Sequence, residues 1–541
     1  MRSRPIALVV AIAIAVLLVG YYFVRKEAPL ASFRAQACEL PDGYLDLIKN
    51  GYYEGRNGQI QILPRRPAYF GTATGGWTHS GPWPYLQRIP LVFYGPGIVP
   101  DIGTVETPAT LADVAPTVAR VLQGSMQTDD GRPLDQVARL NAELLERDRP
   151  RLVVVVVWDG GGWNTLEQWP GEWPNLARLG ERGVSFTNAT VGSSPSVTPA
   201  VHTTLGTGMF PSNHGLTNIP VLDEDGKVVD GFVNGESSRF IQVATLAEHW
   251  DRGNDNRAKI AMIGYEPWHL GMIGQGAERS GGDKDDAVWL NIETNEWTTN
   301  DAHYTLPESI VTTPGLQDDL SDLDAEDGDV DGAWLDNDIL DQPDRIEETP
   351  AFIRYHTRAM MRMISEDGYG SDDLTDLVFT NYKQIDRVGH YFNMDSEEVH
   401  DSVIETDRQL GVLVDFLDDN VGRGRYVVVV TADHGQQPDA RDIKGFSINP
   451  KEIKNDINAE FGDITQAVWP TEVFLDDTAL GRHDVTVREV ARFLGRYTVG
   501  DNIGGRERPT GQFESSDRPL ALAVPSETLI AESCGDGEPG A

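Results

Sequence analysis

Basic residues are scarce in this sequence. It contains 45 Lys and Arg residues against 84 Asp and Glu residues, which gives a formal net charge of −39. Binding to a nucleic-acid duplex requires a basic surface, so we expect no nucleic-acid partner. The same charge would repel a polyanionic substrate unless metal cations reversed the field locally. Because the acidic residues are scattered along the whole chain, solubility is the simplest interpretation of this charge.

Cysteine is nearly absent, with only Cys38 and Cys534 near opposite ends of the chain. In an exported protein such a lone pair suggests one disulfide, and two free thiols are the alternative. Internal repeats are also lacking. A length of 541 residues predicts one large domain or two to three smaller ones.

Charge is missing from residues 6–24, an apolar run long enough to cross a bilayer as a helix. The aromatic residues at 21–23 suit a membrane interface, and a cleaved signal peptide usually has a shorter apolar core. We therefore expect residues 1–30 to be an uncleaved membrane anchor, with the rest of the chain outside the cytoplasm.

Strand-like apolar runs alternate with helix-like stretches, which is typical of a mainly parallel α/β sheet. Buried strands are predicted within 151–164, 376–390 and 425–435, and a weaker one within 259–271. Polar residues follow each strand, and ligands of open α/β sheets gather outside the carboxyl ends of the strands. The residues expected to converge there are Asp159, Asp386, His390, Asp433 and His434.

Composition divides the chain into four parts. These are an anchor (1–30), a first lobe (31–123), a linker with a helix (124–150) and a main domain (151–541). Within the main domain, residues 277–350 are acidic and are predicted to form an insertion or cap over the site. The spacing in 322–332 does not match the EF-hand pattern, so we expect a solvated loop there and no calcium in the insertion.

Thr198 stands before Pro199, which favours the first helical position, so Thr198 is predicted to be a helix N-cap. Its hydroxyl would then lie at the positive end of a helix dipole, where an alkoxide or a phosphate is stabilised. A plain capping role is the alternative. The carboxylates and imidazoles at the strand ends suit zinc or manganese. Two such ions could activate Thr198 as a nucleophile in phosphoryl transfer.

Taken together, these motifs resemble the alkaline phosphatase superfamily, and most closely its type I phosphodiesterase/nucleotide pyrophosphatase branch. They are Asp159 with its glycines, Thr198 with "HG" sixteen residues later, "IDRVGH" and "TADHG", within residues 150–440. The resemblance implies an alkaline-phosphatase-like α/β fold, two zinc ions and a phospho-threonine intermediate. It assigns one zinc to Asp159, Thr198, Asp433 and His434, and the other to Asp386 and His390.

The second zinc lacks a histidine, which the family carries near the end of the domain in a glycine-rich loop before a strand. No residue after 435 fits, and His483 lacks the expected neighbours. The loop around His79 in residues 72–97 does fit. His79 therefore resembles the family's last zinc ligand, moved forward by a circular permutation that makes 31–123 the permuted lobe. A disulfide between Cys38 and Cys534 would restore the connection lost at the joint.

Two positions depart from the family pattern. Asn218 is the candidate for binding a phosphate oxygen, but it lies one residue nearer the "HG" pair than the pattern expects. The Lys-x-Arg pair of the superfamily's threonine-using phosphomonoesterases is replaced by Glu266 and Trp268. The second negative charge of a monoester would be unpaired near Glu266, so diesters are favoured.

We therefore expect a membrane-anchored extracytoplasmic phosphoesterase that hydrolyses phosphodiester or pyrophosphate bonds of small-molecule phosphate esters. An alkaline phosphomonoesterase is the first alternative. A sulfatase is disfavoured because the C/S-x-P-x-R motif is missing. Two further alternatives are a non-catalytic, metal-stabilised surface binding protein and an exported protein whose acidic insertion binds calcium or a partner.

Overall fold

The computed structural model describes most of the chain. The described residues are 31–71, 79–138, 149–291, 293–326, 328–342, 345–506 and 510–534. The predicted anchor at 6–24 lies outside them, as does most of the helix expected within 124–150. Among the described residues, no helix is both long enough and apolar enough to span a membrane.

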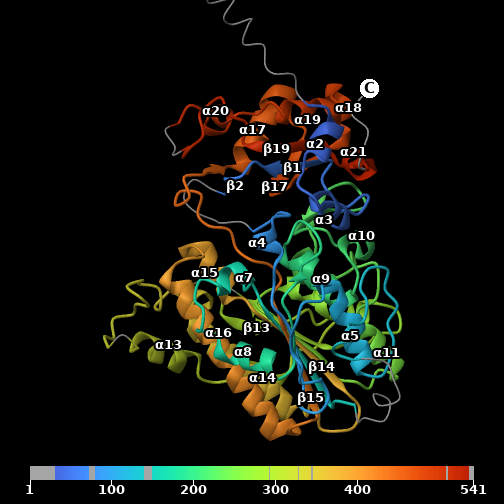
Figure 1. Cartoon of the computed structure of the whole chain (residues 1–541), viewed down its shortest axis with the longest axis vertical. Helices are drawn as coiled ribbons and strands as arrows, with labels where there is room; N and C mark the ends of the chain where they lie inside the picture. The colour runs from blue at the N-terminus through green and yellow to red at the C-terminus, as the bar shows by residue number, and fades with distance from the viewer. Residues whose placement is uncertain are drawn as a thin grey trace, which may run out of the picture.

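A nine-stranded mixed sheet forms the centre of the larger lobe, in the order β13-β12-β11-β14-β6-β15-β3-β7-β4 (Figure 1). Its five parallel inner strands are β12 (Asp286–Asn291), β11 (Ile260–Ile263), β14 (Asp376–Tyr382), β6 (Leu152–Trp158) and β15 (Tyr426–Thr431). The remaining strands are β13 (Glu296–Thr298), β3 (Leu91–Tyr94), β7 (Val184–Phe186) and β4 (Gly103–Val105). The expected α/β class is confirmed, because the four strands predicted from the apolar runs are four of these five inner parallel strands.

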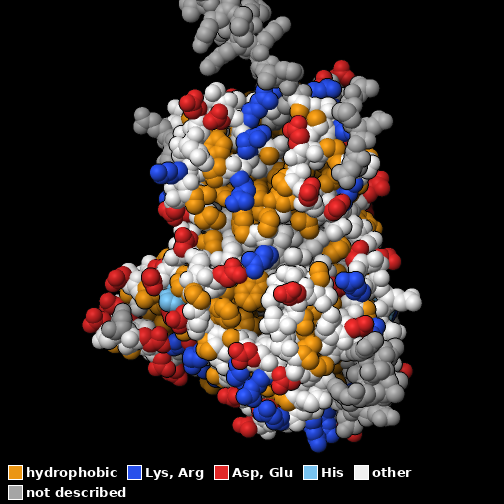
Figure 2. Space-filling model, in the orientation of Figure 1, with side chains coloured by type: hydrophobic (Ala, Val, Ile, Leu, Met, Phe, Trp, Pro, Cys, Tyr) orange, Lys and Arg blue, Asp and Glu red, His pale blue; other side chains and the backbone are white. Residues whose placement is uncertain are grey.

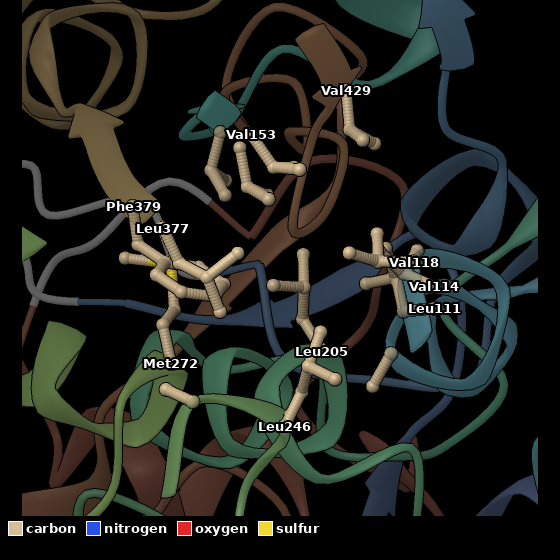
Figure 3. Packing of buried hydrophobic residues seen from close by; sticks show 14 of the residues in the cluster. Leu111, Val114, Val118, Val153, Leu205, Leu246, Met272, Leu377, Phe379 and Val429 are labelled. Carbon is tan, nitrogen blue, oxygen red and sulfur yellow. The ribbon is translucent and has the colours of Figure 1, made fainter. Parts of the chain in front are cut away.

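Helices cover both faces of this sheet. One face carries α5 (Val114–Val121), α9 (Thr198–Thr207) and α11 (Leu246–Gly253). The other carries α8 (Pro174–Glu181), α14 (Pro350–Glu366) and α16 (Glu397–Leu417). Alternate valines of β6 enter the two cores: Val153 packs with the first layer and Val154 with the second. Figure 3 shows Val153 and Val429 facing the first layer. Burial on both faces explains why these strands are unbroken apolar runs.

A smaller lobe is built from both ends of the chain. Its antiparallel sheet has the order β17-β18-β1-β19. The strands are β17 (Thr465–Trp469), β18 (Glu472–Leu475), β1 (Ile60–Pro64) and β19 (Leu520–Pro525). The helices on it include α2 (Phe33–Cys38), α17 (Pro450–Phe461), α19 (Val487–Leu494) and α21 (Ser526–Ala531). Figure 1 shows these elements, in blue and red, above the larger lobe.

This arrangement changes the predicted domain boundaries. Residues 31–123 do not form one lobe, because β1 belongs to the small sheet whereas β3 lies inside the large one. The main domain predicted at 151–541 is divided in the same way, since β17, β18 and β19 leave it. Strands β17 and β18 are joined by a turn at Thr471, which has a φ of 77°.

Only part of the predicted cap is separate from the main sheet. Strands β12 and β13 extend the sheet at its edge, so residues 286–298 are not a cap. Helix α13 (Leu316–Asp324) packs against α14, and acidic side chains gather around it in Figure 2. Near the end of the segment, the backbone oxygen of Glu347 accepts a hydrogen bond from Gln384 Nε2 at 3.1 Å.

The predicted disulfide is present. Cys38 at the end of α2 is bonded to Cys534, with a Cα–Cα distance of 5.4 Å. Nearby, Arg34 forms an ion pair with Glu532 at 2.8 Å. The two ends of the described chain therefore lie side by side in the small lobe.

Candidate functional site

The residues predicted to converge do so at one edge of the large sheet. Asp159 directly follows β6, and Asp433 follows β15. Helix α15 (Gln384–Phe392) begins just after β14 and carries Asp386 and His390 one turn apart. Parallel strands place their carboxyl ends at the same edge, which is why residues far apart in sequence meet here.

Thr198 lies at the same edge, at the start of the buried helix α9. The structure makes Val197 the N-cap and Thr198 the first helical residue, one position from the sequence prediction. Gly208, with φ of 69°, ends the helix. The Thr198 side chain is 2% exposed, and its Oγ1 atom accepts a hydrogen bond from Lys383 Nζ at 3.3 Å. The hydroxyl therefore lies at the positive end of the helix dipole.

One group of possible ligands consists of Asp159, Asp433 and His434, whose ligand atoms lie within 4.8 Å of one another. His434 Nε2 is 3.5 Å from Asp159 Oδ1 and 3.3 Å from Asp433 Oδ2. The other ring nitrogen, Nδ1, is 3.1 Å from the Gly435 carbonyl oxygen. Donation from Nδ1 leaves the Nε2 lone pair directed at the carboxylates.

A second group is formed around Asp386. His79 Nε2 is 3.6 Å from Asp386 Oδ1, and His390 Nε2 is 3.4 Å from Asp386 Oδ2. Ser196 holds His79 through two hydrogen bonds: its hydroxyl donates to the His79 carbonyl at 2.8 Å, and its own carbonyl contacts His79 Nδ1 at 2.9 Å. His79 thus also directs Nε2 into the site.

Burial favours the neutral form of the His79 and His434 imidazoles. Burial lowers the pKa of His434 to about 3 and that of His79 well below its usual value. Burial raises the pKa of Asp433 to about 7 and that of Asp159 well above its usual value. Burial would also raise the pKa of Asp386, but neighbouring positive charge outweighs it and holds that pKa well below the usual value.

These residues fit a divalent metal centre. Among the described residues, Asp433 Oδ2 and His434 Nε2 are buried without a hydrogen-bond partner. Buried polar atoms are rarely left without one, and carboxylate oxygens with imidazole nitrogens are the donor set of zinc and manganese. The first group would hold one ion together with Thr198, and His79, Asp386 and His390 would hold the other.

Lys383 is a site residue that the sequence analysis missed. Its Nζ lies 2.8 Å from Asp386 Oδ2 and 3.1 Å from Asp159 Oδ1. Burial opposes its charge, but these carboxylates outweigh burial and raise the pKa of Lys383 well above its usual value. Its position three residues before Asp386, at the start of the same helix, was the signal in the sequence.

A buried polar layer behind the carboxylates was also missed. Asn381 Nδ2 donates to Asp159 Oδ2 at 2.9 Å, and His202 Nε2 is 3.8 Å from Asp433 Oδ2. His202 Nδ1 is 2.9 Å from His269 Nδ1. His202 follows Thr198 by four residues, so helical spacing places both on one face of α9. This layer orients the carboxylates from behind.

Two further candidates from the sequence, Glu266 and Asn218, belong to neither of the two ligand groups. Glu266 follows β11 at the same edge; burial raises its pKa, and the charges of Lys383 and Arg387 offset part of that rise. Asn218 is fully buried, and its Oδ1 accepts a hydrogen bond from the backbone N–H of Ile219 at 2.9 Å. Among the described residues, no hydrogen bond joins Asn218 to Thr198.

Comparison with known proteins gives a family match and several relatives. The sequence profile of the type I phosphodiesterase/nucleotide pyrophosphatase family matches residues 153–503. Alkaline phosphatase PafA of Elizabethkingia meningoseptica is 24% identical over 410 residues, which are 64% of this chain and 72% of that protein. A Myroides odoratus protein named calcium-transporting ATPase is 24% identical over 417 residues, 65% of this chain and 74% of that one. A crystal structure of PafA, at 21% identity, matches with a TM-score of 0.54 over 64% of this chain and 76% of its own, so the two share a fold.

Proposed function

Because this chain belongs to the type I phosphodiesterase/nucleotide pyrophosphatase family and is a phosphoesterase of the alkaline phosphatase superfamily, we propose that it uses Thr198 as a nucleophile against phosphodiester or pyrophosphate bonds. The observation that carries the proposal is the position of Thr198 Oγ1. It lies at the start of a buried helix and within hydrogen-bond distance of Lys383, whose ammonium group also contacts Asp159 and Asp386.

In the proposed reaction, Thr198 Oγ1 forms a bond to phosphorus while the bond from phosphorus to the leaving oxygen breaks. The hydroxyl proton is lost to solvent, and the leaving oxygen takes up a proton from solvent. Water then cleaves the phospho-threonine and regenerates the hydroxyl. The N-terminus of α9 favours the negative charge that develops on the nucleophile and on the transferred group.

Two divalent cations, which we propose to be zinc, would supply Lewis-acid stabilisation of the attacking and leaving oxygens when bound. Other residues of the chain hold the metal-binding side chains in a fixed orientation. Ser196 orients His79, the Gly435 carbonyl orients His434, and Asn381 orients Asp159. Such outer contacts commonly change metal affinity or activity by about 10–100-fold.

Lys383 has a separate role in this proposal. Its Nζ donates a hydrogen bond to the Thr198 oxygen and so stabilises negative charge there and on a phosphoryl oxygen. Charge-assisted hydrogen bonds of this kind are roughly twice as strong as neutral ones. Burial keeps water from screening the interaction.

Glu266 supports diesters as the substrate class. Its carboxylate lies near Lys383 and Arg387 and reduces the positive charge available to a substrate. A diester carries one negative charge on its phosphoryl group, whereas a monoester carries about two. Monoester hydrolysis is the second candidate function, because two of the relatives are named alkaline phosphatases.

We also propose export, with residues 1–30 as the membrane anchor, and a circular permutation that moved His79 to the front of the chain. A structural disulfide supports an oxidising compartment. The contact of His79 with Asp386 and the bonded ends of the chain support the permutation. Termini that lie close together tolerate such a rearrangement.

The nucleophile can be tested by trapping the intermediate. After rapid acid quenching with bis-p-nitrophenyl phosphate, we expect the peptide that contains Thr198 to carry one p-nitrophenyl phosphoryl group. The Thr198→Ala variant, with its metal content verified, should carry none. Turnover without modification of this peptide would contradict the proposed intermediate.

A further inference from the structure

Three aspartates form a second acidic cluster, away from the candidate active site. Asp251 lies on α11, and Asp283 and Asp285 lie in the segment that leads into β12, which begins at Asp286. Each offers a carboxylate oxygen, and these oxygens lie within 4.8 Å of one another. Since the inner strands are parallel, this cluster lies at their amino ends, on the edge opposite Thr198.

Burial makes the cluster unusual. Asp251 is 4% exposed, and among the described residues its Oδ1 atom is buried without a hydrogen-bond partner. Asp285 is 9% exposed. A buried carboxylate oxygen without a partner is costly, and three carboxylates that face one another add like-charge repulsion. A bound cation would relieve both costs.

No side chain supplies that cation in the described part of the chain. Within 4.0 Å, no Lys or Arg forms an ion pair there with Asp251, Asp283 or Asp285. Three basic side chains line the cavity beside Asp283 and Asp285, and they donate to backbone oxygens instead: Lys259 to Gly368, Lys284 to Asp301, and Arg257 to Asn254.

We propose that Asp251, Asp283 and Asp285 bind a calcium ion that stabilises the sheet edge formed by β11 and β12. Oxygen-only donors select a hard cation over zinc. Calcium accepts six to eight oxygens in flexible geometry, whereas magnesium requires a near-ideal octahedron. A cavity of about 290 Å³ next to the cluster leaves room for water ligands; its charged lining residues are Asp283, Asp285, Asp286 and Asp367 together with Arg257, Lys259 and Lys284. The site differs from the 322–332 loop, although Asp283 and Asp285 lie within residues 277–350, where the sequence predicts no calcium.

The test uses the full zinc-loaded protein and calcium chloride as the probe. Asp283→Asn removes one exposed donor, and Asp225→Asn, in the exposed turn between β9 (Pro220–Leu222) and β10 (Val228–Asp230), is the matched control. Calorimetry should detect about one calcium per chain, and Asp283→Asn should weaken that binding by about tenfold or more, since donor charge sets affinity. Calcium should raise the Tm of the wild type and of Asp225→Asn, but hardly that of Asp283→Asn.

The calcium-free proteins separate this result from a folding defect. Without calcium, Asp283→Asn should be at least as stable as the wild type, because one repelling charge is gone. Its zinc content and phosphoesterase turnover should be unchanged. The proposal would be overturned if calcium raised the Tm of Asp283→Asn and Asp225→Asn equally, or if the wild type bound no calcium at all. Tighter binding of magnesium chloride than of calcium chloride would overturn the assignment to calcium.

Discussion

The imidazole rings of His79 and His434 stack, with centroids 3.5 Å apart and planes inclined by 12°. The sheet explains this contact between two distant parts of the chain. Strand β3 follows His79, strand β15 precedes His434, and the two strands pair antiparallel with Leu91 opposite Thr431. The start of β3 therefore lies beside the end of β15, which brings both histidines to the same edge.

His79→Ala should cost about one equivalent of tightly bound zinc, because the site loses one of its few nitrogen donors. The measurement is zinc per chain after dialysis against a weak chelator. His483→Ala is the control, since His483 is an exposed histidine of the small lobe. Equal zinc content in both variants would refute the role of His79 and remove the main support for the permutation.

Thr198→Ala should keep its zinc and lose nearly all turnover, because the remaining ligands stay in place while the nucleophile is gone. Thr198→Ser, which keeps a hydroxyl, should retain part of the activity. Turnover of bis-p-nitrophenyl phosphate and zinc content are measured on the same preparations. Full activity in Thr198→Ala would exclude Thr198 as the nucleophile.

Lys383→Met should lower kcat by roughly 10–100-fold without loss of zinc, since it removes a charge-assisted hydrogen bond to the Thr198 oxygen. Methionine keeps most of the volume of the side chain. Lys227→Met, at an exposed lysine, is the control and should leave kcat unchanged. An unchanged kcat in Lys383→Met would show that the lysine is not needed in the reaction.

Glu266→Gln should raise monoester turnover relative to diester turnover by about tenfold, because removal of the carboxylate leaves more positive charge for the second charge of a monoester. The readout is the ratio of kcat/KM for p-nitrophenyl phosphate and bis-p-nitrophenyl phosphate. Glu236→Gln, at an exposed position, provides the baseline. A constant ratio would mean that Glu266 does not set this preference.

Replacing Cys38 and Cys534 with serine should lower the free energy of unfolding by about 2–5 kcal/mol, because the disulfide restrains the unfolded chain. Denaturant titration of the full-length protein, which follows unfolding of the small lobe, measures the change. The wild type under reducing conditions serves as a second comparison. Stability equal to that of the oxidised wild type would show that the link between the chain ends is dispensable.

The central strands and the residues after them could be predicted from the sequence. Strand β6 is an unbroken run of β-branched residues that is buried on both faces, and few other structures accept such a run. Topology then places Asp159 and Asp433 at the same edge. The prediction that Asp159 and Asp433 lie together therefore needed only the strands and their direction, whereas His79 was identified from the family resemblance.

The small lobe could not be predicted in the same way. Strand β1 pairs with β18 and β19, so its partners come from the opposite end of the chain. No local pattern encodes such a pairing. Thr471, in the turn between β17 and β18, has a positive φ, which is typical of glycine or asparagine, so the sequence does not predict this turn. Acidic residues at the starts of β12 and β13 concealed an inner strand and the edge strand beside it within a segment that was interpreted as a cap.

Lys383 was missed for a different reason. Its role depends on three groups from separate elements that surround its ammonium group, namely Asp159, Asp386 and Thr198. Only the spacing to Asp386 is visible in the sequence. A lysine at the start of a helix is usually a solvated surface residue.

We propose that this chain is a metal-dependent phosphoesterase that prefers diesters. The test is to measure metals per chain by elemental analysis, together with turnover of bis-p-nitrophenyl phosphate and p-nitrophenyl phosphate before and after chelation. We predict about two zinc ions per chain in the active site, faster diester turnover, and loss of both activities on chelation. A protein that holds no transition metal and hydrolyses neither ester would contradict the account.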